Sequence, residues 1–410
     1  MPKFTVKTML KKAIRDCLEY DKNTTTEELF KEMFEYLLEL ERDSFMGYPQ
    51  GERKRLTSNK RNGYYERLIK NLRGTFSVKV PRDRNGEFIP VTLEMLKKDE
   101  EELKMLGYKL YSKGMTTRDI SDVFKTTFGA SYSPQAVSNI TKGFEGHRIR
   151  WQKRILDSDY YFIYIDALHT KIRRATVSSE AIYVVIGLKK NLERDVLGIY
   201  SIPQESAAGW KEVLKDLKKR GVQRFIMCIA DGIANLEDAL SEVYPKAKLQ
   251  KCVVHKIRNI LLKCRPKDKA SMSADLRYIF DLDNPNHTYE EACNRINLFL
   301  QKWKKSYPKL CAKFREDTRH YYFQYLEFPV AIRRMIYTTN WIERLNKHLR
   351  KVERNKNSFP NEDSAINLLY MSVIEFDEKV YKYKVSSFLS SQNFLNNMLD
   401  DIYPFQTQKF

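Results

Sequence analysis

The chain has 410 residues, and its 73 lysines and arginines exceed its 53 aspartates and glutamates by 20 charges at neutral pH. An excess this large is typical of proteins that bind a polyanion such as nucleic acid. Hydrophobic residues make up 42% of the sequence, with only 15 glycines and 13 prolines, which excludes a disordered or collagen-like chain and provides material for several cores.

Several classes of protein are disfavoured by what the sequence lacks. No apolar run approaches the roughly 18 residues of a membrane helix, and the first residues offer no apolar core for a signal peptide, so we expect no membrane partner and a cytoplasmic location. The six cysteines form no C-x-x-C pair, which argues against a disulfide framework and a four-cysteine zinc site. Neither glycine-rich nucleotide motif is present, so we expect no use of ATP.

The chain begins with a small helical unit. Apolar residues between positions 9 and 18 have helical spacing, and a second helix is predicted from the Thr25-x-x-Glu28 capping box. For this unit, packing or self-association is a better explanation than direct DNA contact.

A strongly basic segment follows. Between residues 53 and 84, eleven basic residues face only two acidic ones, whereas a solvated surface usually mixes both signs. The candidate contacts to the DNA backbone in this segment are Arg61, Arg82 and Arg84. The alternation over residues 75–80, ended by Pro81, predicts a short strand.

Residues 114–142 have the pattern of helix, turn and helix. A threonine at 116 or 117 caps the first helix, Gly129 ends it, and Pro134 starts the second. Polar residues of the types that contact bases and phosphates lie off the apolar face of the second helix: Gln135, Ser138, Asn139 and Lys142. Two short helices occur in many folds, so the prediction of DNA binding here depends largely on the net positive charge of the chain.

After residue 151 the hydrophobic period changes to that of strands. Four runs have strand character: residues 160–165, 181–188, 196–202 and 225–230. Helical spacing over residues 206–220 separates the last two runs. Three strands, a helix and a fourth strand form the order of an RNase H-like core. Helical signals dominate from residue 257 to about 336, which indicates an all-helical insertion.

The expected fold class is multidomain α/β plus α, with an RNase H-like mixed-sheet catalytic domain interrupted by the helical insertion and preceded by helical and helix-turn-helix DNA-binding regions. The expected segments are a helical unit at 1–45, a basic DNA-binding segment at 46–112, a helix-turn-helix at 113–150, the first part of the core at 151–256, the insertion at 257–336, final core helices at 337–380 and a polar tail at 381–410.

Three acidic residues are candidates for chemistry. Asp166 follows the first strand run and Asp231 the fourth, and open α/β sheets place sites at such strand ends. Glu343 opens a helix downstream and could join them. Carboxylates without a partner cysteine or histidine suit Mg²⁺, and two such ions about 4 Å apart support in-line displacement at phosphorus. We expect Mn²⁺ to substitute.

Structural roles compete with this interpretation. Asp166 and Asp231 could cap a following turn or helix, and Asn340-x-x-Glu343 has the form of an N-terminal capping box. The residues alone leave both interpretations open. One and two turns beyond Glu343, Lys347 and Arg350 share its helix face and are candidates for holding the DNA backbone.

Cys252-x-x-His255 follows a short predicted strand at residues 247–250. Structural zinc is the obvious alternative for this pair, but a closed zinc site needs four ligands, and the other cysteines and histidines have no suitable spacing. We therefore do not expect zinc.

Taken together, these strings resemble the transposases of the IS256 and Mutator family. The resemblance rests on IDALHTKIRR at Asp166, ADGIANLEDAL at Asp231, KCVVHKIRNIL at Cys252 and TTNWIERLNKHLR at Glu343, together with KRNGYYERLIKNLRGTFSVKVPRDRNGEFIP upstream. It covers most of residues 45–375.

The resemblance implies a DDE transposase with Asp166, Asp231 and Glu343 as its catalytic and metal-binding triad. It places Cys252 and His255 beside the active site as supporting residues. It further implies binding to terminal inverted repeats and target DNA, exposure of a 3′-hydroxyl and strand transfer. A homo-oligomer is expected, because two element ends must be cut and joined together.

Two other functions remain to be separated from transposition. A domesticated or regulatory DNA-binding protein would keep end recognition without catalysis, and a plain RNase H-like nuclease would cut without joining. A strand-transfer assay distinguishes all three.

Overall fold

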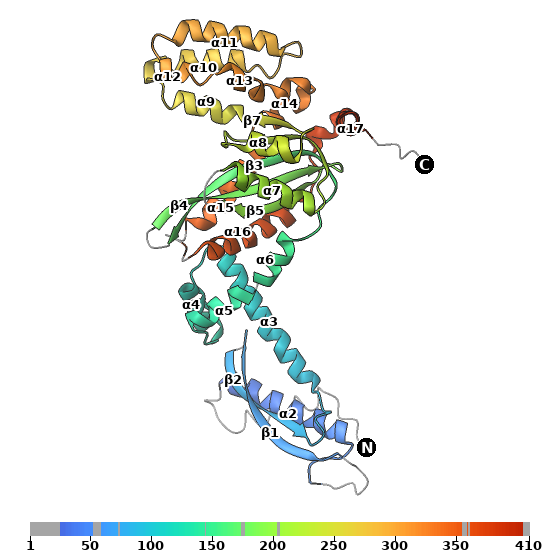
Figure 1. Cartoon of the computed structure of the whole chain (residues 1–410). Coiled ribbons are helices and arrows are strands. Elements are labelled where there is room, and N and C mark those ends of the chain that lie inside the picture. The colour runs from blue at the N-terminus through green and yellow to red at the C-terminus, as the bar shows by residue number, and fades with distance from the viewer. Residues whose placement is uncertain are drawn as a thin grey trace, which may run out of the picture. The chain divides into compact units, whose positions relative to one another are not determined.

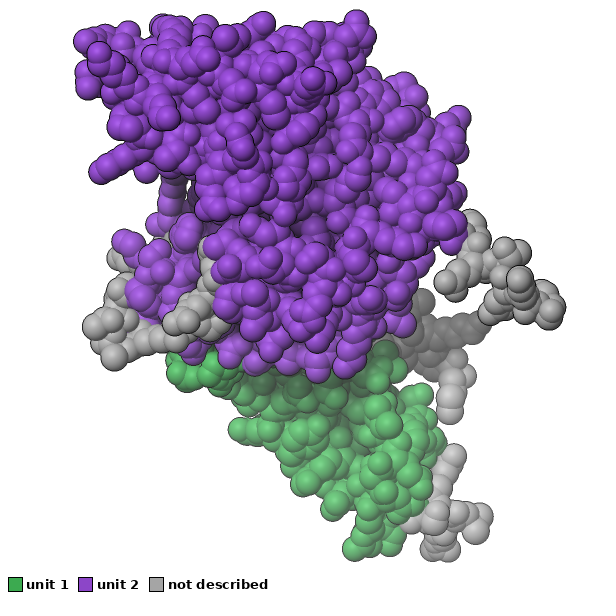
Figure 2. Space-filling model, turned by 45° about the horizontal axis from the view of Figure 1, so that its top comes forward, with its two compact units in different colours: residues 1–144 green, residues 145–410 purple. Residues whose placement is uncertain are grey.

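The computed structural model describes residues 25–51, 59–72, 74–143, 145–173, 177–202, 206–354, 359 and 361–404. The chain forms two compact units, residues 1–144 and residues 145–410 (Figure 2). The helix predicted between residues 9 and 18 lies outside the described residues. Among the described helices, none is both long enough and apolar enough to cross a membrane.

The first unit begins with a helix packed on a β-hairpin (Figure 1). Helix α2 (Thr26–Met46) starts at the predicted capping box, in which the side chains of Thr25 and Glu28 accept from each other's backbone N–H groups. It covers strands β1 (Arg61–Asn71) and β2 (Gly74–Asp83), which pair antiparallel. The buried residues of this core include Phe34, Leu38, Ile69, Phe76, Val78 and Val80.

The predicted end of the strand at Pro81 is wrong. Strand β2 continues to Asp83, and Pro81 pairs with Tyr64 of β1. Proline lacks the N–H group that a central strand needs, but each strand of a two-stranded hairpin has one edge that needs no partner. The sequence does not indicate β1, because its polar run lacks apolar alternation.

Helix α3 (Val91–Ser112) is followed by two short helices, α4 (Thr117–Phe128) and α5 (Pro134–Gly143). Both short helices lie where the sequence predicts them. A capping box at Thr116 starts α4, and Gly129 ends it at a φ of 63°, a left-handed conformation that glycine adopts without strain. The three helices share a small apolar core of Leu103, Ile120, Phe124, Ala130 and Val137.

The second unit is built on a five-stranded mixed sheet with the order β5-β4-β3-β6-β7. Strands β5, β4 and β3 pair antiparallel, whereas β6 and β7 run parallel to β3. The strands are β3 (Asp159–Arg173), β4 (Val177–Lys189), β5 (Arg194–Ser201), β6 (Arg224–Ala230) and β7 (Lys248–Lys251). All five contain or overlap the strand runs predicted from the sequence.

Helices cover both faces of this sheet (Figure 1). Helices α7 (Ala207–Lys219) and α8 (Leu236–Val243) share one core with Ile165 of β3. The preceding residue, Tyr164, lies 5.1 Å from the ring of Trp341 on a different helix. Because successive strand residues point to opposite faces, the sheet is buried on both sides, which explains its almost uniformly apolar strands.

The chain between β7 and residue 339 is helical wherever it has regular structure. Its α-helices are α9 (Val253–Leu261), α10 (Lys269–Ile279), α11 (Tyr289–Trp303), α12 (Pro308–Cys311), α13 (Glu316–Arg319) and α14 (Val330–Ile336), joined by 3₁₀ turns at Pro266–Asp268, His320–Tyr322 and Gln324–Glu327.

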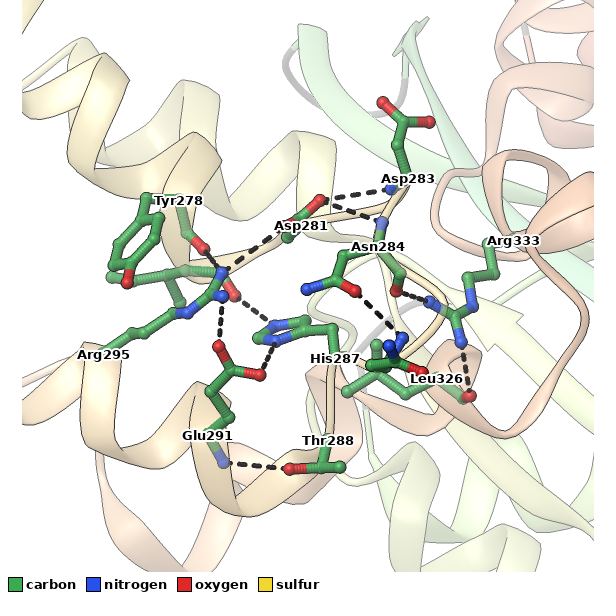
Figure 3. Close-up of polar contacts among 12 residues, drawn as sticks. Tyr278, Asp281, Asp283, Asn284, His287, Thr288, Glu291, Arg295, Leu326 and Arg333 are labelled. Atoms are coloured by element: carbon green, nitrogen blue, oxygen red, sulfur yellow. Dashed lines mark hydrogen bonds and ion pairs between the residues drawn. The ribbon is translucent and has the colours of Figure 1, made fainter.

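A polar network ties these helices together (Figure 3). The Nε2 atom of His287 donates to the carbonyl of Ile279 at 3.0 Å, and its Nδ1 atom lies 3.2 Å from Glu291. From α14, Arg333 donates to the carbonyl of Asn284 at 2.8 Å. These contacts satisfy buried backbone carbonyls, so we assign the network to the stability of the helical region.

The last helices return to the sheet. Helix α6 (Glu145–Gln152) precedes the sheet in the chain, and α15 (Asn340–Glu353), α16 (Glu362–Phe376) and a π-helical turn at Asp377–Tyr381 follow the helical region. Where the sequence indicates only a polar tail, the structure has a 3₁₀ helix at Ser386–Ser391 and helix α17 (Gln392–Ile402). These helices bury Phe388, Leu395 and Leu399. The apolar residues of this segment are too sparse for the sequence to predict that they are buried.

Candidate active site

Asp166 and Asp231 are positioned by neighbouring strands of the sheet, Asp166 within β3 and Asp231 directly after β6. The parallel pairing of β3 with β6 ends at the partners Ile165 and Ala230, and each aspartate is the next residue along its chain. The sequence suggested that Asp166 lies at the end of a strand. Strand β3 continues to Arg173 along β4, so Asp166 lies within the strand. Because Ile165 and Ala230 are paired, the two aspartates that follow them lie at the same level of neighbouring strands.

His255 connects Asp231 to the third acid. Its Nδ1 atom lies 3.5 Å from Oδ1 of Asp231, and its Nε2 atom lies 3.5 Å from Oε1 of Glu343. His255 is on α9 and Glu343 is on α15. Elements far apart in the sequence therefore bring two of the predicted acids to opposite sides of one imidazole ring.

Asn346 connects the same helix α15 to Asp166. Its Nδ2 atom donates to Oδ2 of Asp166 at 2.8 Å, and the backbone N–H of Ala167 donates to Oδ1 at 2.9 Å. Asn346 is completely buried, and Asp166 is only 7% exposed. One helix thus carries Glu343 and, three residues later, the side chain that binds Asp166.

Glu343 does not belong to a capping box. The N-cap of α15 is Thr339, without a side-chain cap, and Asn340 is already the first helical residue. Instead, the Glu343 carboxylate faces α9, where Nη1 of Arg258 lies 3.2 Å from Oε1. The structural alternative that the sequence left open for Glu343 is therefore wrong.

The electrostatics of the site reflect its buried acids. Burial raises the pKa of Asp166 to about 6, and the charge of Asp231 adds to this effect. Interaction with the Cys252 side chain raises the pKa of His255 to about 9, with further contributions from Asp231 and Asp166. The imidazolium form of His255 is therefore favoured between the carboxylates.

Cys252 supports the site through its backbone and its sulfur. Its N–H donates to the carbonyl of Ala230 at 2.8 Å, directly before Asp231, and its sulfur accepts from the hydroxyl of Thr339 at 3.6 Å. Burial opposes ionisation of the thiol, but the contact with His255 outweighs it and lowers the pKa of Cys252. In the part of the chain that the structure describes, no three histidine, cysteine or acidic residues are grouped closely enough to hold a metal ion.

The carboxylates nevertheless fit Mg²⁺ by their chemistry. Asp166, Asp231 and Glu343 offer hard oxygen donors, and Asp166 is a buried carboxylate for which the described residues supply no lysine or arginine in ion-pair contact. Burial makes the ionised form of Asp166 costly, and the charge of His255 offsets only part of that cost, so a divalent cation would stabilise this carboxylate further.

The predicted DNA contacts in the first unit are in different environments. Arg61 is bound within the protein, since its Nη2 atom lies 2.8 Å from Asp43 and donates to the carbonyl of Tyr48. Its side chain is only 17% exposed, so the structure assigns Arg61 to the junction of the hairpin with α2. Arg82 and Arg84 are exposed.

On α5, Gln135, Asn139 and Lys142 are exposed and Ser138 is half-buried. The amide of Gln135 donates to Asn139 at 3.2 Å, so the two side chains lie together on the outer face. On α15 of the second unit, Lys347 and Arg350 are exposed. The predicted polar faces of both helices are therefore accessible.

Sequence reasoning missed Arg258 and Asn346. Each lies three residues after a predicted site residue on the same helix, Arg258 after His255 and Asn346 after Glu343, and residues at this spacing share a helix face. That spacing is the one signal from which they could have been found.

The family of the chain follows from comparison with known proteins. The family model described as "Transposase, Mutator family" matches residues 2–383. The chain belongs to the Mutator family of transposases. The strings around Asp166, Asp231 and Glu343 all lie within this match.

Relatives in this transposase family span most of the chain. The transposase for insertion sequence element IS905 of Lactococcus lactis is 34% identical over 80% of this chain and 83% of its own length. The IS1201 transposase of Lactobacillus helveticus is 35% identical over 83% of this chain and 91% of its own length. The transposase of IS256 in transposon Tn4001 of Staphylococcus aureus is 30% identical over 91% and 96%.

A solved Drosophila P element transposase strand transfer complex overlaps 75% of this chain and 92% of its own chain, at 10% identity and a TM-score of 0.29. A likeness of this size carries no conclusion about the present fold.

Proposed function

We propose that this Mutator-family transposase cuts DNA at the terminal inverted repeats of an insertion sequence and joins the exposed 3′-hydroxyl to other DNA, with Asp166, Asp231 and Glu343 as its catalytic carboxylates. The observation that carries the proposal is that the two nitrogens of His255 lie 3.5 Å from Asp231 and from Glu343, while Asn346, on the same helix as Glu343, donates to Asp166.

The three carboxylates would hold Mg²⁺, with Mn²⁺ as a substitute. Bound there, two ions would activate the attacking oxygen and stabilise the leaving oxygen at phosphorus. Asp166 presents its oxygens from within β3, Asp231 directly after the neighbouring strand β6, and Glu343 from a helix packed on β3. Placing ligands on regular elements fixes their geometry better than loops would.

His255 and Cys252 support the carboxylates in this proposal. The His255 ring lies within ion-pair distance of both Asp231 and Glu343, so it keeps two like charges together. Cys252 raises the pKa of His255 to about 9 and anchors its own backbone beside Ala230. The pair thus acts on the position of the acids and not as zinc ligands.

We also propose that the second unit is an RNase H-like domain with a helical insertion. Support comes from three antiparallel strands followed by two parallel ones, with helices on both faces. The insertion separates Asp231 from Glu343 in the chain. The fold returns α15 to the sheet beside β3.

The first unit would read the inverted repeats through α4 and α5 as a helix-turn-helix. The exposed polar face of α5 carries Gln135 and Lys142, which suit a base edge and a phosphate respectively. Arg82 and Arg84 on the hairpin, and Lys347 and Arg350 on α15, would hold phosphates. Two ends must be joined in one event, so we propose a homo-oligomer as the active form, without ATP.

The test uses full-length protein, a labelled duplex carrying the DNA end that flanks the gene, and a target plasmid. Wild type should give Mg²⁺-dependent nicks and joined product, and Asp166→Asn and Asp231→Asn should give neither while still binding DNA. Asp238→Asn, at an exposed acid on α8, is the matched control. Nicks without joined product in the wild type would favour the nuclease, and binding without nicks the regulator.

A further inference from the structure

A buried amide contacts one of the proposed catalytic acids. Asn346 is 0% exposed, and its Nδ2 atom donates to Asp166 at 2.8 Å. Its other polar atom, Oδ1, is also buried and has no hydrogen-bond partner among the described residues. An unpaired buried carbonyl oxygen costs free energy, so stability alone gives little reason for an asparagine at this position.

The orientation of the amide is determined by Asp166. An ionised carboxylate can only accept hydrogen bonds, so Nδ2 must face Asp166 and Oδ1 must point away from it. The rotamer of the carboxylate is thereby held from two sides, by Asn346 on Oδ2 and by the backbone N–H of Ala167 on Oδ1. Each carboxylate oxygen retains a lone pair that is free to bind a cation.

The neutrality of the amide is equally important. A lysine or arginine in this position would pair with Asp166 and compete with a metal ion for the same charge, whereas asparagine orients the carboxylate and leaves the charge in place. Hydrogen-bonding partners of metal ligands act in this way, and their loss typically weakens metal binding about 10–100-fold.

We propose that Asn346 is a positioning residue that orients Asp166 for divalent metal and couples it mechanically to Glu343 through α15. This inference rests on the proposed function, in which both acids are metal ligands. Glu343 and Asn346 share one helix. A displacement of α15 would therefore move the Glu343 carboxylate and at the same time break the hydrogen bond from Asn346 to Asp166.

The test is Mn²⁺ binding to the DNA-free, full-length protein, followed by the electron paramagnetic resonance signal of free Mn²⁺. Asn346→Leu removes the donor while keeping the branch at Cγ and should raise the Mn²⁺ dissociation constant about 10–100-fold. The matched control is Asn367→Leu on α16, a half-buried amide whose Oδ1 is likewise unpaired among the described residues. This control should bind Mn²⁺ like the wild type.

A second readout separates positioning from a general structural role. With Asn346→Leu, the Mn²⁺ concentration for half-maximal nicking should rise by the same factor, and saturating Mn²⁺ should restore most of the maximal rate. Unchanged Mn²⁺ affinity, or a loss of maximal rate that metal does not rescue, would overturn the inference. If Asn346→Leu does not fold, Asn346→Ser, which is too short to reach Asp166, decides by the same criteria.

The outcome also distinguishes this inference from the proposed function. If Asp166→Asn binds Mn²⁺ as tightly as the wild type, the proposed metal site is wrong. If Asp166→Asn loses binding while Asn346→Leu keeps it, the metal site stands and the role assigned to Asn346 fails.

Discussion

The guanidinium of Arg258 on α9 faces the carboxylate of Glu343 on α15, with Nη1 3.2 Å from Oε1. The Arg258 side chain is 56% exposed and Glu343 is 24% exposed, so the pair lies at the open side of the site. In this arrangement the Arg258 guanidinium pairs with the Glu343 carboxylate, which a metal ion would need as a ligand.

We therefore expect Arg258→Ala to tighten Mn²⁺ binding by the DNA-free protein. An exposed ion pair is worth about 0.2–1 kcal/mol, so the gain should be about 1.5- to 5-fold. Titration calorimetry measures this change, and Arg315→Ala is the control, because the exposed Arg315 pairs with Asp317 away from the acids. Weaker Mn²⁺ binding in Arg258→Ala would show that the arginine supports the metal site instead of competing with it.

Glu343→Gln should leave the fold intact and abolish nicking and joining. The carboxylate makes no helix cap, so the thermal unfolding midpoint should change little, while a neutral amide is a poor ligand for Mg²⁺. The comparison variant is Glu290→Gln, at an exposed acid in the first turn of α11. Near wild-type transposition by Glu343→Gln would transfer the role of third ligand to Glu362 or Glu353.

Arg82 and Arg84 should contribute to DNA affinity, and Arg61 should not. Replacing either exposed arginine by alanine should make the slope of log affinity against log salt shallower by about one. Arg61→Ala should keep the slope and lower thermal stability, because it breaks the contact with Asp43. Fluorescence anisotropy at several salt concentrations measures the slopes. An equal decrease of the salt slope in all three variants would show that Arg61 also contacts DNA.

Cys252→Ser should yield a folded protein with reduced activity and no change in metal content. The sulfur lies near His255 and Thr339, and no cluster of zinc ligands surrounds it within the described ranges. Elemental analysis of the purified wild type checks this expectation. Stoichiometric zinc that Cys252→Ser releases would contradict it.

Asp377→Asn should stabilise the protein at neutral pH but not at pH 4. Burial, with a contribution from Asp195, raises the pKa of Asp377 to about 6, and its Oδ1 atom is buried without a partner among the described residues. The folded protein therefore binds more protons than the unfolded chain between pH 4 and 6, and the wild type loses stability as the pH rises through this range.

The asparagine variant removes this loss, so its advantage over the wild type should grow to about 1 kcal/mol by pH 7. Thermal unfolding midpoints at pH 4 and pH 7 measure the difference. Asp401→Asn, at an exposed position, serves as the reference, and an advantage for Asp377→Asn that is already complete at pH 4 would contradict the explanation.

Local chemistry made much of this protein predictable from its sequence. The capping boxes at Thr25 and Thr116, the left-handed Gly129 and the apolar runs of the sheet depend on neighbouring residues and on hydrophobic period. Asp231 could be placed directly after its strand for the same reason. Strand β1 escaped prediction because its polar run lacks apolar alternation, and helix α17 because its burial depends on partners far along the chain.

The sequence by itself determined the residue types of the site, its basic surroundings and the order of its elements. Only the tertiary structure decided that Glu343 faces Arg258 and His255 instead of capping α15, that Arg61 is bound to Asp43, and that Asn346 holds Asp166. These contacts join residues from 18 to 180 positions apart. No local pattern encodes such pairs: the contacts of the site arise when α9 and α15 pack at the sheet, and the Arg61 contact arises when the hairpin packs on α2.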